Sequence, residues 1–504
     1  MSSQSLSKSK YLRGLQCHKS LWLQKDGKIK PTPVSKSSQI IFDEGTRVGE
    51  EAQKLFPGGK LIKYEGSTFD EKIAKTKEWL ASGESTIYEA TFKFDNILVM
   101  VDILTKGKNG WEIYEVKSAA KVYKNKSNKV QDVYINDVAI QYYVLKGSGL
   151  DISSVFLVHI NNQYVRQGPL EIDKLFLFAD LTEPVIEAQN VVVDELGRIR
   201  KVLNGDEPEI KIGVHCDKPY ECDFKTHCWS DEILNGYTVF NIGGLHSSKK
   251  FELYESGVTK IKDVPETFPL TKSQRLQVEI ELSGKEVVDS KQIDNFLNNL
   301  YYPLYFLDFE TFTQIIPEWD DLRPYQKIPF QYSIHYIERE GECATHLEFL
   351  ADENSDPRKS IADRLVGDIP KGACVLVYNW SFEKGVIQDL VKQFPGYSDH
   401  LMNIHDNIMD LMVPFQKKYY YKKEMKGRYS IKAVLPALTS DSSYSKMTIN
   451  EGMEASNNYK SLSSITDTIA REKIKDDLKV YCKQDTQSMI DVLECLKKVN
   501  LRNN

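Results

Sequence analysis

The stretch Leu304–Phe312, LYFLDFETF, is a nearly continuous apolar run interrupted only by Asp308 and Glu310. Such a run is typical of a strand that is buried on both faces. Side chains two residues apart on a strand point to the same side, so the two carboxylates are expected to lie together. At ~4 Å in a partly dry site, their repulsion would amount to about 4 kcal/mol. A divalent cation removes this cost, and carboxylate oxygens suit Mg²⁺ or Mn²⁺. The pair therefore predicts a metal site, and the alternative is a strand end with two solvated acids.

The composition predicts a protein of several domains without a membrane segment. A chain of 504 residues is too long for one core, so two or three domains are expected. No apolar run approaches the ~20 residues of a membrane span. The first residues, MSSQSLSKSKYLRG, lack the apolar core of a signal peptide, so a cytoplasmic location is expected. The net charge of −6 gives no global attraction to nucleic acid. Binding to a polyanion would therefore need local basic patches and acidic sites filled by metal.

A second set of acids lies on predicted strands of the N-terminal half. Ile97–Leu104 is an apolar strand broken only by Asp102. Trp111–Ser118 reads WEIYEVKS and places Glu115 and Lys117 on one face of the next strand. An Asp and a Glu on adjacent strands can hold a metal that polarises a phosphate. The lysine can stabilise the negative charge that develops during the reaction.

Asp102 with the Glu-x-Lys of Glu115 and Lys117 resembles the core motif of the PD-(D/E)XK nucleases. Gln141 lies in a helix-like stretch where RecB-type members of this family carry a glutamine that supports the site. The upstream histidine that these members commonly carry is missing here. The resemblance implies a restriction-endonuclease-like domain in which Asp102 and Glu115 bind metal. It also implies that Lys117 stabilises charge and that Gln141 supports the catalytic side chains.

Cysteines are grouped after these motifs. His215–Trp229 reads HCDKPYECDFKTHCW and contains Cys216, Cys222 and Cys228. Cytosolic cysteines grouped in this way more often bind metal than form disulfides. A closed tetrahedral zinc site or a [4Fe–4S] cluster needs a fourth thiolate. Cys17, within the predicted helix Ser5–Leu23, is the only other cysteine before the midpoint of the chain.

This arrangement, with one cysteine before the nuclease motifs and three after them, resembles that of CRISPR-associated and AddB-type iron–sulfur exonucleases. The resemblance implies that a [4Fe–4S] cluster is bound by Cys17, Cys216, Cys222 and Cys228. The cluster would join the two ends of the domain around its sheet. Zinc in place of iron, and no metal at all, are the alternatives.

Residues 236–300 differ from both flanking regions. Lys249–Ser256 and Lys291–Leu300 are predicted helices. Phe251–Pro265 has a helix–Gly-Val–helix pattern that is typical of a helix-hairpin-helix element. Such an element can bind a phosphate backbone, and the alternative is a packing linker.

Two helical motifs follow the opening acidic pair in the C-terminal region. Asn379–Gly385 reads NWSFEKG and opens a helix that carries Glu383. Leu478–Asp491 reads LKVYCKQDTQSMID, in which Tyr481 and Asp485 are four residues apart and share one helical face.

The order Asp-x-Glu, Asn-x-x-Phe-acid and Tyr-x-x-x-Asp resembles that of the DEDDy exonucleases of the RNase H-like fold. In that family four acids hold two metal ions around the scissile phosphate, and the tyrosine helps to place the attacking water. The resemblance implies Asp308, Glu310 and Asp485 as ligands and Tyr481 as the water-positioning group. Glu383 stands where the family usually has Asp, and Asp410 is an extra or replacement acid.

These features predict an α/β protein with two nuclease domains. Residues 1–235 would form the PD-(D/E)XK domain, residues 236–300 a helical linker, and residues 301–504 the RNase H-like domain. Bacterial proteins of unassigned role that join these two domains resemble nearly the whole chain. The expected activity is metal-dependent, exonucleolytic hydrolysis of single-stranded DNA, or of RNA. The alternative is a nucleic-acid-binding scaffold, or the partner of a helicase in repair or defence, with one or both sites inactive.

Overall fold

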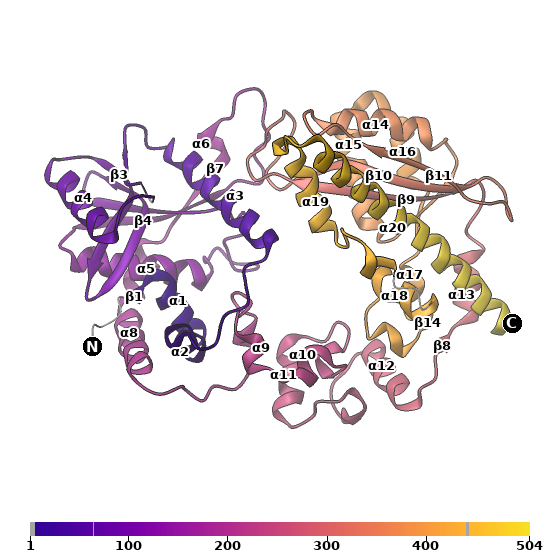
Figure 1. Ribbon diagram of the computed structural model, residues 1–504, viewed down its shortest axis with the longest axis horizontal. Coiled ribbons are helices and arrows are strands. Elements are labelled where there is room, and N and C mark those ends of the chain that lie inside the picture. Colours follow the sequence, from indigo (N-terminus) through magenta and orange to yellow (C-terminus); the bar gives the residue numbers. More distant parts are fainter. Residues whose placement is uncertain (1–5, 64, 440–442, 504) are drawn as a thin grey trace. The chain divides into compact units, whose positions relative to one another are not determined.

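The computed structural model describes residues 6–63, 65–439 and 443–503, which form helices and mixed β-sheets (Figure 1). The chain divides into two compact units. The first comprises Met1–Ser230 with Gln314–Tyr325, and the second comprises Asp231–Thr313 with Gln326–Asn504. The predicted α/β class is thus confirmed at this level. Within the described part of the chain, no helix is both long and apolar enough to cross a membrane.

The first unit is built around a mixed sheet with the strand order β2-β3-β4-β5-β6-β7, in which β1 also pairs with β4. The strands are β1 (Leu6–Ser7), β2 (Lys60–Leu61), β3 (Thr86–Phe94), β4 (Ile97–Lys106), β5 (Trp111–Lys117), β6 (Ile152–Ile160) and β7 (Phe176–Asp180). The helices are α1 (Lys8–Gln16), α2 (His18–Asp26), α3 (Lys36–Gln53), α4 (Phe69–Ala81), α5 (Asp132–Gly147), α6 (Ile172–Leu175), α7 (Thr182–Glu187), α8 (Gln189–Asn204) and α9 (Lys225–Cys228).

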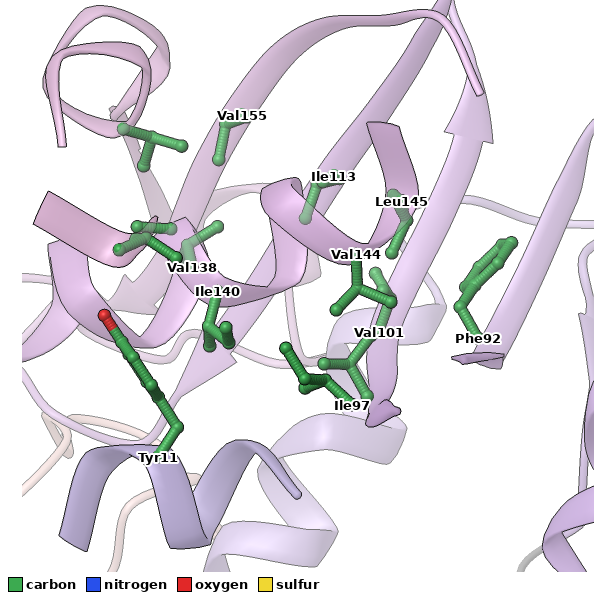
Figure 2. Packing of buried hydrophobic residues seen from close by; sticks show 14 of the residues in the cluster. Tyr11, Phe92, Ile97, Val101, Ile113, Val138, Ile140, Val144, Leu145 and Val155 are labelled. Atoms are coloured by element: carbon green, nitrogen blue, oxygen red, sulfur yellow. The ribbon is translucent and has the colours of Figure 1, made fainter. Parts of the chain in front are cut away.

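Helices cover both faces of this sheet. On one face, α5 packs its apolar residues against β4 and α1, as Figure 2 shows for Val138, Ile140, Val144, Ile97, Val101 and Tyr11. On the other face, α3 packs together with residues 314–325, through Val48, Ala52, Ile315 and Ile316. The short segment from the second half of the sequence therefore completes the core of the first unit.

Strands β3 and β4 are irregular beside the predicted acids. On β4, Val101 and Leu104 belong to the core under α5, whereas Ile103 packs on the opposite face. The face alternation of the strand therefore changes at Asp102. Glu89 and Asp102 are both left out of the β3–β4 register between neighbouring pairs, and the φ of Glu89, 57°, is in the left-handed region. A residue other than glycine is strained there, and such irregularities are frequent beside functional sites.

The predicted helix Ser5–Leu23 is in fact two helices that meet at Cys17. The backbone of Cys17 is extended, with φ −162° and ψ 116°, and this residue ends α1 and begins α2. The side chain of Ser7 accepts a hydrogen bond from the backbone N–H of Lys10, so α1 begins at Lys8. The thiol of Cys17 therefore lies at a corner between two helices and not in the middle of one.

The second unit contains a mixed sheet with the strand order β11-β10-β9-β12-β13 and a pairing of β14 with β8. The strands are β8 (Val287–Val288), β9 (Leu304–Thr313), β10 (Lys327–Ile337), β11 (Thr345–Leu350), β12 (Cys374–Val377), β13 (Ile408–Asp410) and β14 (Tyr420–Tyr421). The helices are α10 (Asp231–Asn235), α11 (Ser247–Glu255), α12 (Lys272–Ser283), α13 (Ser290–Leu297), α14 (Pro357–Asp368), α15 (Trp380–Gln393), α16 (Ser398–Asp406), α17 (Val413–Gln416), α18 (Ile431–Thr439), α19 (Gly452–Ser461) and α20 (Thr468–Asn503).

Strand β9 divides its side chains between two layers of helices. Tyr305, Leu307 and Phe309 pack with residues of α14, α15 and α16. Because side chains alternate along a strand, Asp308 and Glu310 point to the opposite face. Helices α19 and α20 lie against β9 on this acidic face (Figure 1). The opening stretch of the sequence thus forms the expected inner strand, with its acids facing helix α20.

Residues 236–300 belong to the second unit. Helices α11 and α13 lie close to the predicted positions, and α12 was not predicted. After α11, the segment with the helix-hairpin-helix pattern continues as a three-residue 3-10 helix, Ile261–Asp263.

Candidate metal centres

The first unit brings the predicted side chains of its motif together, and we call this group the N-terminal acid site. Nε2 of Gln141 donates a hydrogen bond to Oε2 of Glu115 at 2.7 Å. Nζ of Lys117 lies 2.7 Å from Oε1 of the same carboxylate. The backbone N–H of Val116 donates to Oδ2 of Asp102 at 2.7 Å. Glu115 is 1% exposed, so the group lies inside the protein.

Two further charged residues complete this site, and the sequence analysis missed both. Nζ of Lys8 lies 2.8 Å from Oε1 of Glu115 and 3.1 Å from Oδ1 of Asp137. The other oxygen of Asp137 lies 2.6 Å from Nζ of Lys117. Lys8 is 107 residues away from Glu115 in the sequence, and no local spacing connects them. The sequence signal that could have pointed to Lys8 is Ser7, a residue type that caps helices, because it predicts that the helix leading to Cys17 begins at Lys8.

The lysines hold one acid of the N-terminal acid site in its ionised form. Burial alone would raise the pKa of Glu115, but Lys117 and Lys8 hold this pKa far below its usual range. Burial and the charge of Glu115 raise the pKa of Asp102 to about 8. The same two causes raise the pKa of Glu89 to about 6. The N-terminal acid site therefore combines a Glu115 that two lysines keep ionised with an Asp102 whose ionisation burial and the charge of Glu115 oppose.

In the second unit, the predicted acids also come together, and we call them the C-terminal acid site. Asp308 and Glu310 lie on β9, and the charge of Asp485 on α20 acts on Asp308. Glu383 in the first turn of α15 feels the charge of Asp308 in turn. Glu310, Glu383 and Asp485 are at most 8% exposed. One oxygen each of Asp308 and Glu310 and the sulfur of Cys482 lie within 4.8 Å of one another.

Positive charge compensates the C-terminal acid site only in part, since the charge of Lys432 lowers the pKa of Asp308 and Glu310 less than burial and the neighbouring acids raise it. Burial and the charge of Asp485 raise the pKa of Asp308 well above its usual range. Burial and the charge of Asp308 do the same for Glu310 and Glu383. Among the residues that the structure describes, Oε2 of Glu383 is buried without a hydrogen-bond partner. A divalent cation would supply the missing positive charge and the missing partner.

Aromatic hydroxyls and one lysine surround these acids. The hydroxyl of Tyr444 donates to Oδ1 of Asp485 at 2.6 Å, and burial raises the pKa of Asp485 to about 6. Nζ of Lys432 donates to the hydroxyl of Tyr481 at 2.9 Å. Lys432 and Tyr444 are separated from the predicted motif by 49 and 41 residues, so motif spacing could not reveal them. Cys482, by contrast, precedes Asp485 by three residues, and helical spacing could have placed it on the same face.

Asp410 has a different environment from the other acids. Its two oxygens accept hydrogen bonds from the backbone N–H groups of Asn379, Trp380 and Met412, at 3.0, 3.1 and 2.9 Å. These bonds hold the start of α15, the helix that carries Glu383. Asp410 is thus engaged as a cap that fixes the position of Glu383.

The four predicted cysteines line a common cavity, and we call them the cysteine cluster. Side chains of α1 hold the loop of Cys216, Cys222 and Cys228 next to Cys17. Nε2 of Gln16 donates to the backbone oxygens of His215 and Tyr220 at 2.8 and 2.7 Å. The guanidinium of Arg13 donates two hydrogen bonds to the carboxylate of Asp223, at 2.6 and 2.9 Å.

Burial raises the pKa of Cys17, and negative charge on the sulfurs of Cys222 and Cys216 would raise it further. Burial also raises the pKa of Cys228. The thiols therefore need a positive partner if they are to ionise together. All four cysteines line the same cavity, and within the described part of the chain no three of their sulfurs form a group within 4.8 Å of one another.

Comparisons with known proteins match parts of this chain. A family model described as "Domain of unknown function (DUF2779)" matches residues 305–430. The matched segment contains Asp308, Glu310, Glu383 and Asp410, and it ends just before α18. The curated "Uncharacterized protein UU173" of Ureaplasma parvum serovar 3 is 25% identical over 219 residues, 38% of this chain and 31% of that protein. The chain thus spans less than a third of the length of this relative.

Proposed function

We propose that this protein is a metal-dependent nuclease that hydrolyses phosphodiester bonds of single-stranded DNA or RNA, and that the C-terminal acid site is its main active centre. The observation that carries the proposal is the gathering of four carboxylates on β9, α15 and α20 whose negative charge Lys432 and Lys327 offset only in part among the described residues. A fold does not keep such a group without a partner, because each buried carboxylate raises the cost of ionising the next.

The donor set fits hard divalent cations. Asp308, Glu310, Glu383 and Asp485 offer oxygens, and the unpartnered Oε2 of Glu383 is a ready ligand. When bound, Mg²⁺ or Mn²⁺ would polarise the phosphodiester and lower the pKa of the attacking water. Tyr481 would orient that water, and Lys432 holds the tyrosine hydroxyl in place. This arrangement supports an RNase H-like exonuclease of the DEDDy type.

The N-terminal acid site would be a second nuclease site of the PD-(D/E)XK type. Asp102 and Glu115 would bind metal, Lys117 would stabilise charge on the phosphate, and Gln141 would orient Glu115. Metal binding there must compete with the ion pairs that Lys8 and Lys117 make with Glu115. This competition favours the C-terminal acid site as the stronger of the two.

The cysteine cluster would hold an iron–sulfur group with a structural role. Cys17 ends α1, and Lys8 at the start of α1 contacts Glu115. A cluster bound at Cys17 would therefore fix the helix that delivers Lys8 to the N-terminal acid site. Anaerobic purification with iron, sulfide and zinc analysis distinguishes a [4Fe–4S] cluster from zinc.

The decisive test of activity uses matched labelled DNA and RNA single strands with Mn²⁺. Asp308→Asn inactivates the proposed main site, and Asp102→Asn inactivates the second. Asp399→Asn, an exposed acid on α16, is the matched control for a lost carboxylate. We expect Asp308→Asn to abolish most cleavage, Asp102→Asn to reduce it less, and Asp399→Asn to leave it unchanged.

Two results would contradict this proposal. Cleavage that survives both acid-site substitutions would come from another protein or another site. Binding of the labelled strands without cleavage at any metal concentration would favour the alternative of a scaffold or helicase partner. Two departures from the family patterns favour that alternative. Glu383 stands where the DEDDy family usually has Asp, and the upstream histidine of the RecB-type members is missing.

A further inference from the structure

Cys482 adds a sulfur donor to the C-terminal acid site. Helix α20 places this residue between Tyr481 and Asp485, and its side chain is fully buried. Its sulfur lies 3.9 Å from the backbone oxygen of Asp308. The sulfur also lies within 4.8 Å of one carboxylate oxygen of Asp308 and one of Glu310.

These three atoms can converge on one ion. A tetrahedral zinc ion with Zn–S of about 2.3 Å and Zn–O of about 2.1 Å needs ligand atoms about 3.4–3.6 Å apart. The 4.8 Å limit on the present separations leaves a closing movement of about 1 Å, which side-chain rotation can supply. Three protein donors with an open fourth position are the usual ligand set of a catalytic zinc site, in which water or substrate takes the fourth position.

The sulfur changes which ions the site prefers. Mg²⁺ and Mn²⁺ prefer oxygen donors, whereas a thiolate selects Zn²⁺ and similar softer ions. Independently, Oε2 of Glu383, a residue that is 2% exposed, has no hydrogen-bond partner among the described residues, and this atom indicates a missing ligand close to Asp308. The same centre can therefore hold two kinds of ion, through overlapping ligands.

We propose that the C-terminal acid site binds Zn²⁺ through Asp308, Glu310 and Cys482, and that this ion competes with Mg²⁺ or Mn²⁺ and inhibits the nuclease. On binding, a sulfur–zinc bond forms and the thiol proton leaves to solvent. The inference rests on the proposed function in one respect, namely that Asp308 and Glu310 bind metal. It adds that the thiol makes zinc a regulator of the same site.

The test uses Co²⁺ as a spectroscopic substitute for Zn²⁺ in the full-length protein. A thiolate bound to Co²⁺ gives a near-ultraviolet charge-transfer band. We expect the absorbance of this band to be lower in Cys482→Ser and Cys482→Ala than in the wild type, by the contribution of one thiolate. Adding Zn²⁺ to the cobalt-loaded wild type should remove the same contribution. Cys374→Ser is the matched control, because Cys374 on β12 is an equally buried thiol of the same unit. Its spectrum should equal that of the wild type, and the cysteine cluster contributes equally to all variants.

Binding measurements separate this inference from the proposed function. Zn²⁺ affinity measured by calorimetry should fall about 10- to 100-fold or more in Cys482→Ala, while Mn²⁺ binding measured by electron paramagnetic resonance persists. Asp308→Asn should lose both ions. Equal cobalt spectra and equal Zn²⁺ affinities in Cys482→Ala and the wild type would overturn the role of Cys482 and leave the nuclease proposal standing. Mn²⁺ binding that is indifferent to Asp308→Asn would overturn both.

Discussion

The two acid sites solve the problem of buried negative charge in opposite ways. In the N-terminal acid site, Lys8 and Lys117 contact Glu115 directly, and its pKa lies far below the usual range. In the C-terminal acid site, burial and neighbouring carboxylates raise the pKa of Asp308, Glu310 and Glu383, and Lys432 offsets this only in part. In the first site two lysines balance Glu115, and Asp102 alone of its two predicted metal ligands has a raised pKa, whereas most acids of the second site depend on protons or on added cations. The difference predicts which site responds more strongly to metal.

The largest expected effect concerns metal binding and activity. We expect Asp308→Asn to lower Mn²⁺-dependent cleavage by at least about 100-fold, since it removes a ligand from the proposed main site. In the wild type, Mn²⁺ at about 100 times its dissociation constant should raise the free energy of unfolding by about 2.7 kcal/mol. Calorimetric unfolding with and without Mn²⁺ measures this increase in the free energy of unfolding.

Asp102→Asn provides the comparison. It should retain most of the Mn²⁺-dependent stabilisation, because metal at the N-terminal acid site must displace ion pairs. An equal loss of stabilisation in Asp102→Asn and Asp308→Asn would show that the two sites do not differ in their need for metal.

The next effect is that neutralising one acid in each site changes the free energy of unfolding in opposite directions when a chelator removes divalent ions. Glu115→Gln should lower the free energy of unfolding by about 3 kcal/mol, because two lysines lose their buried counter-charge. Asp485→Asn should raise it by about 3 kcal/mol, because the substitution removes a carboxylate that the folded state keeps protonated up to about pH 6. Urea-induced unfolding of each variant measures both values.

Lys8→Met is the matched control for the N-terminal acid site. It should destabilise the protein less than Glu115→Gln, since Lys117 remains beside both acids. Destabilisation by Asp485→Asn in the chelator would mean that the C-terminal acid site is balanced without metal, contrary to the comparison.

Both acid sites could be predicted largely from sequence because their central residues lie on short motifs. The strand predicted at Trp111–Ser118 is β5, Trp111–Lys117, and the opening stretch Leu304–Phe312 lies within β9. A run of apolar residues fixes a buried strand, and its period of two fixes which acids share a face. Gln141 was expected to support this site, and the structure adds that it does so through a hydrogen bond to Glu115.

What the sequence did not reveal was the set of charges around the motifs. Lys8, Lys432 and Tyr444 reach their sites through tertiary contacts across 41 to 107 residues. The break at Cys17 was missed because apolar spacing continues across it, whereas the extended backbone of this residue is imposed by its place between two helices. Local patterns therefore identified the acids, but only the structure distinguishes a balanced site from an unbalanced one.

A smaller effect is the pH dependence of the metal-free protein. The pKa of Asp485 is raised to about 6 in the folded state, against about 3.9 for an unperturbed Asp. Between these values the folded state binds the extra proton, so this group stabilises the fold as the pH falls and destabilises it as the pH rises through 6. The stability difference between Asp485→Asn and the wild type should therefore shrink from about 3 kcal/mol at pH 7.5 toward zero near pH 4.

Urea titrations at several pH values, with a chelator present, follow this difference. Asp399→Asn, an exposed acid, should show no comparable pH-dependent gap. A gap for Asp485→Asn that stays constant with pH would mean that this carboxylate is not protonated in the fold. The charge of the C-terminal acid site would then be compensated in some other way.

The smallest effect tests the strained backbone beside the N-terminal acid site. Glu89 has a φ of 57° within β3, a conformation that glycine adopts without strain. Glu89→Gly should therefore stabilise the fold by up to about 1 kcal/mol, although glycine is normally unfavourable in a strand. Glu89→Gln keeps the strain and removes only the charge, so it serves as the control in the same unfolding measurements. If Gly lowers stability below that of Gln, the irregular strand is not a source of strain. The second measurement adds Glu89→Gly to the Asp308→Asn protein, in which the remaining cleavage is assigned to the N-terminal acid site. If Glu89→Gly stabilises the fold while this remaining cleavage falls, the strain at Glu89 serves to position the acids of that site.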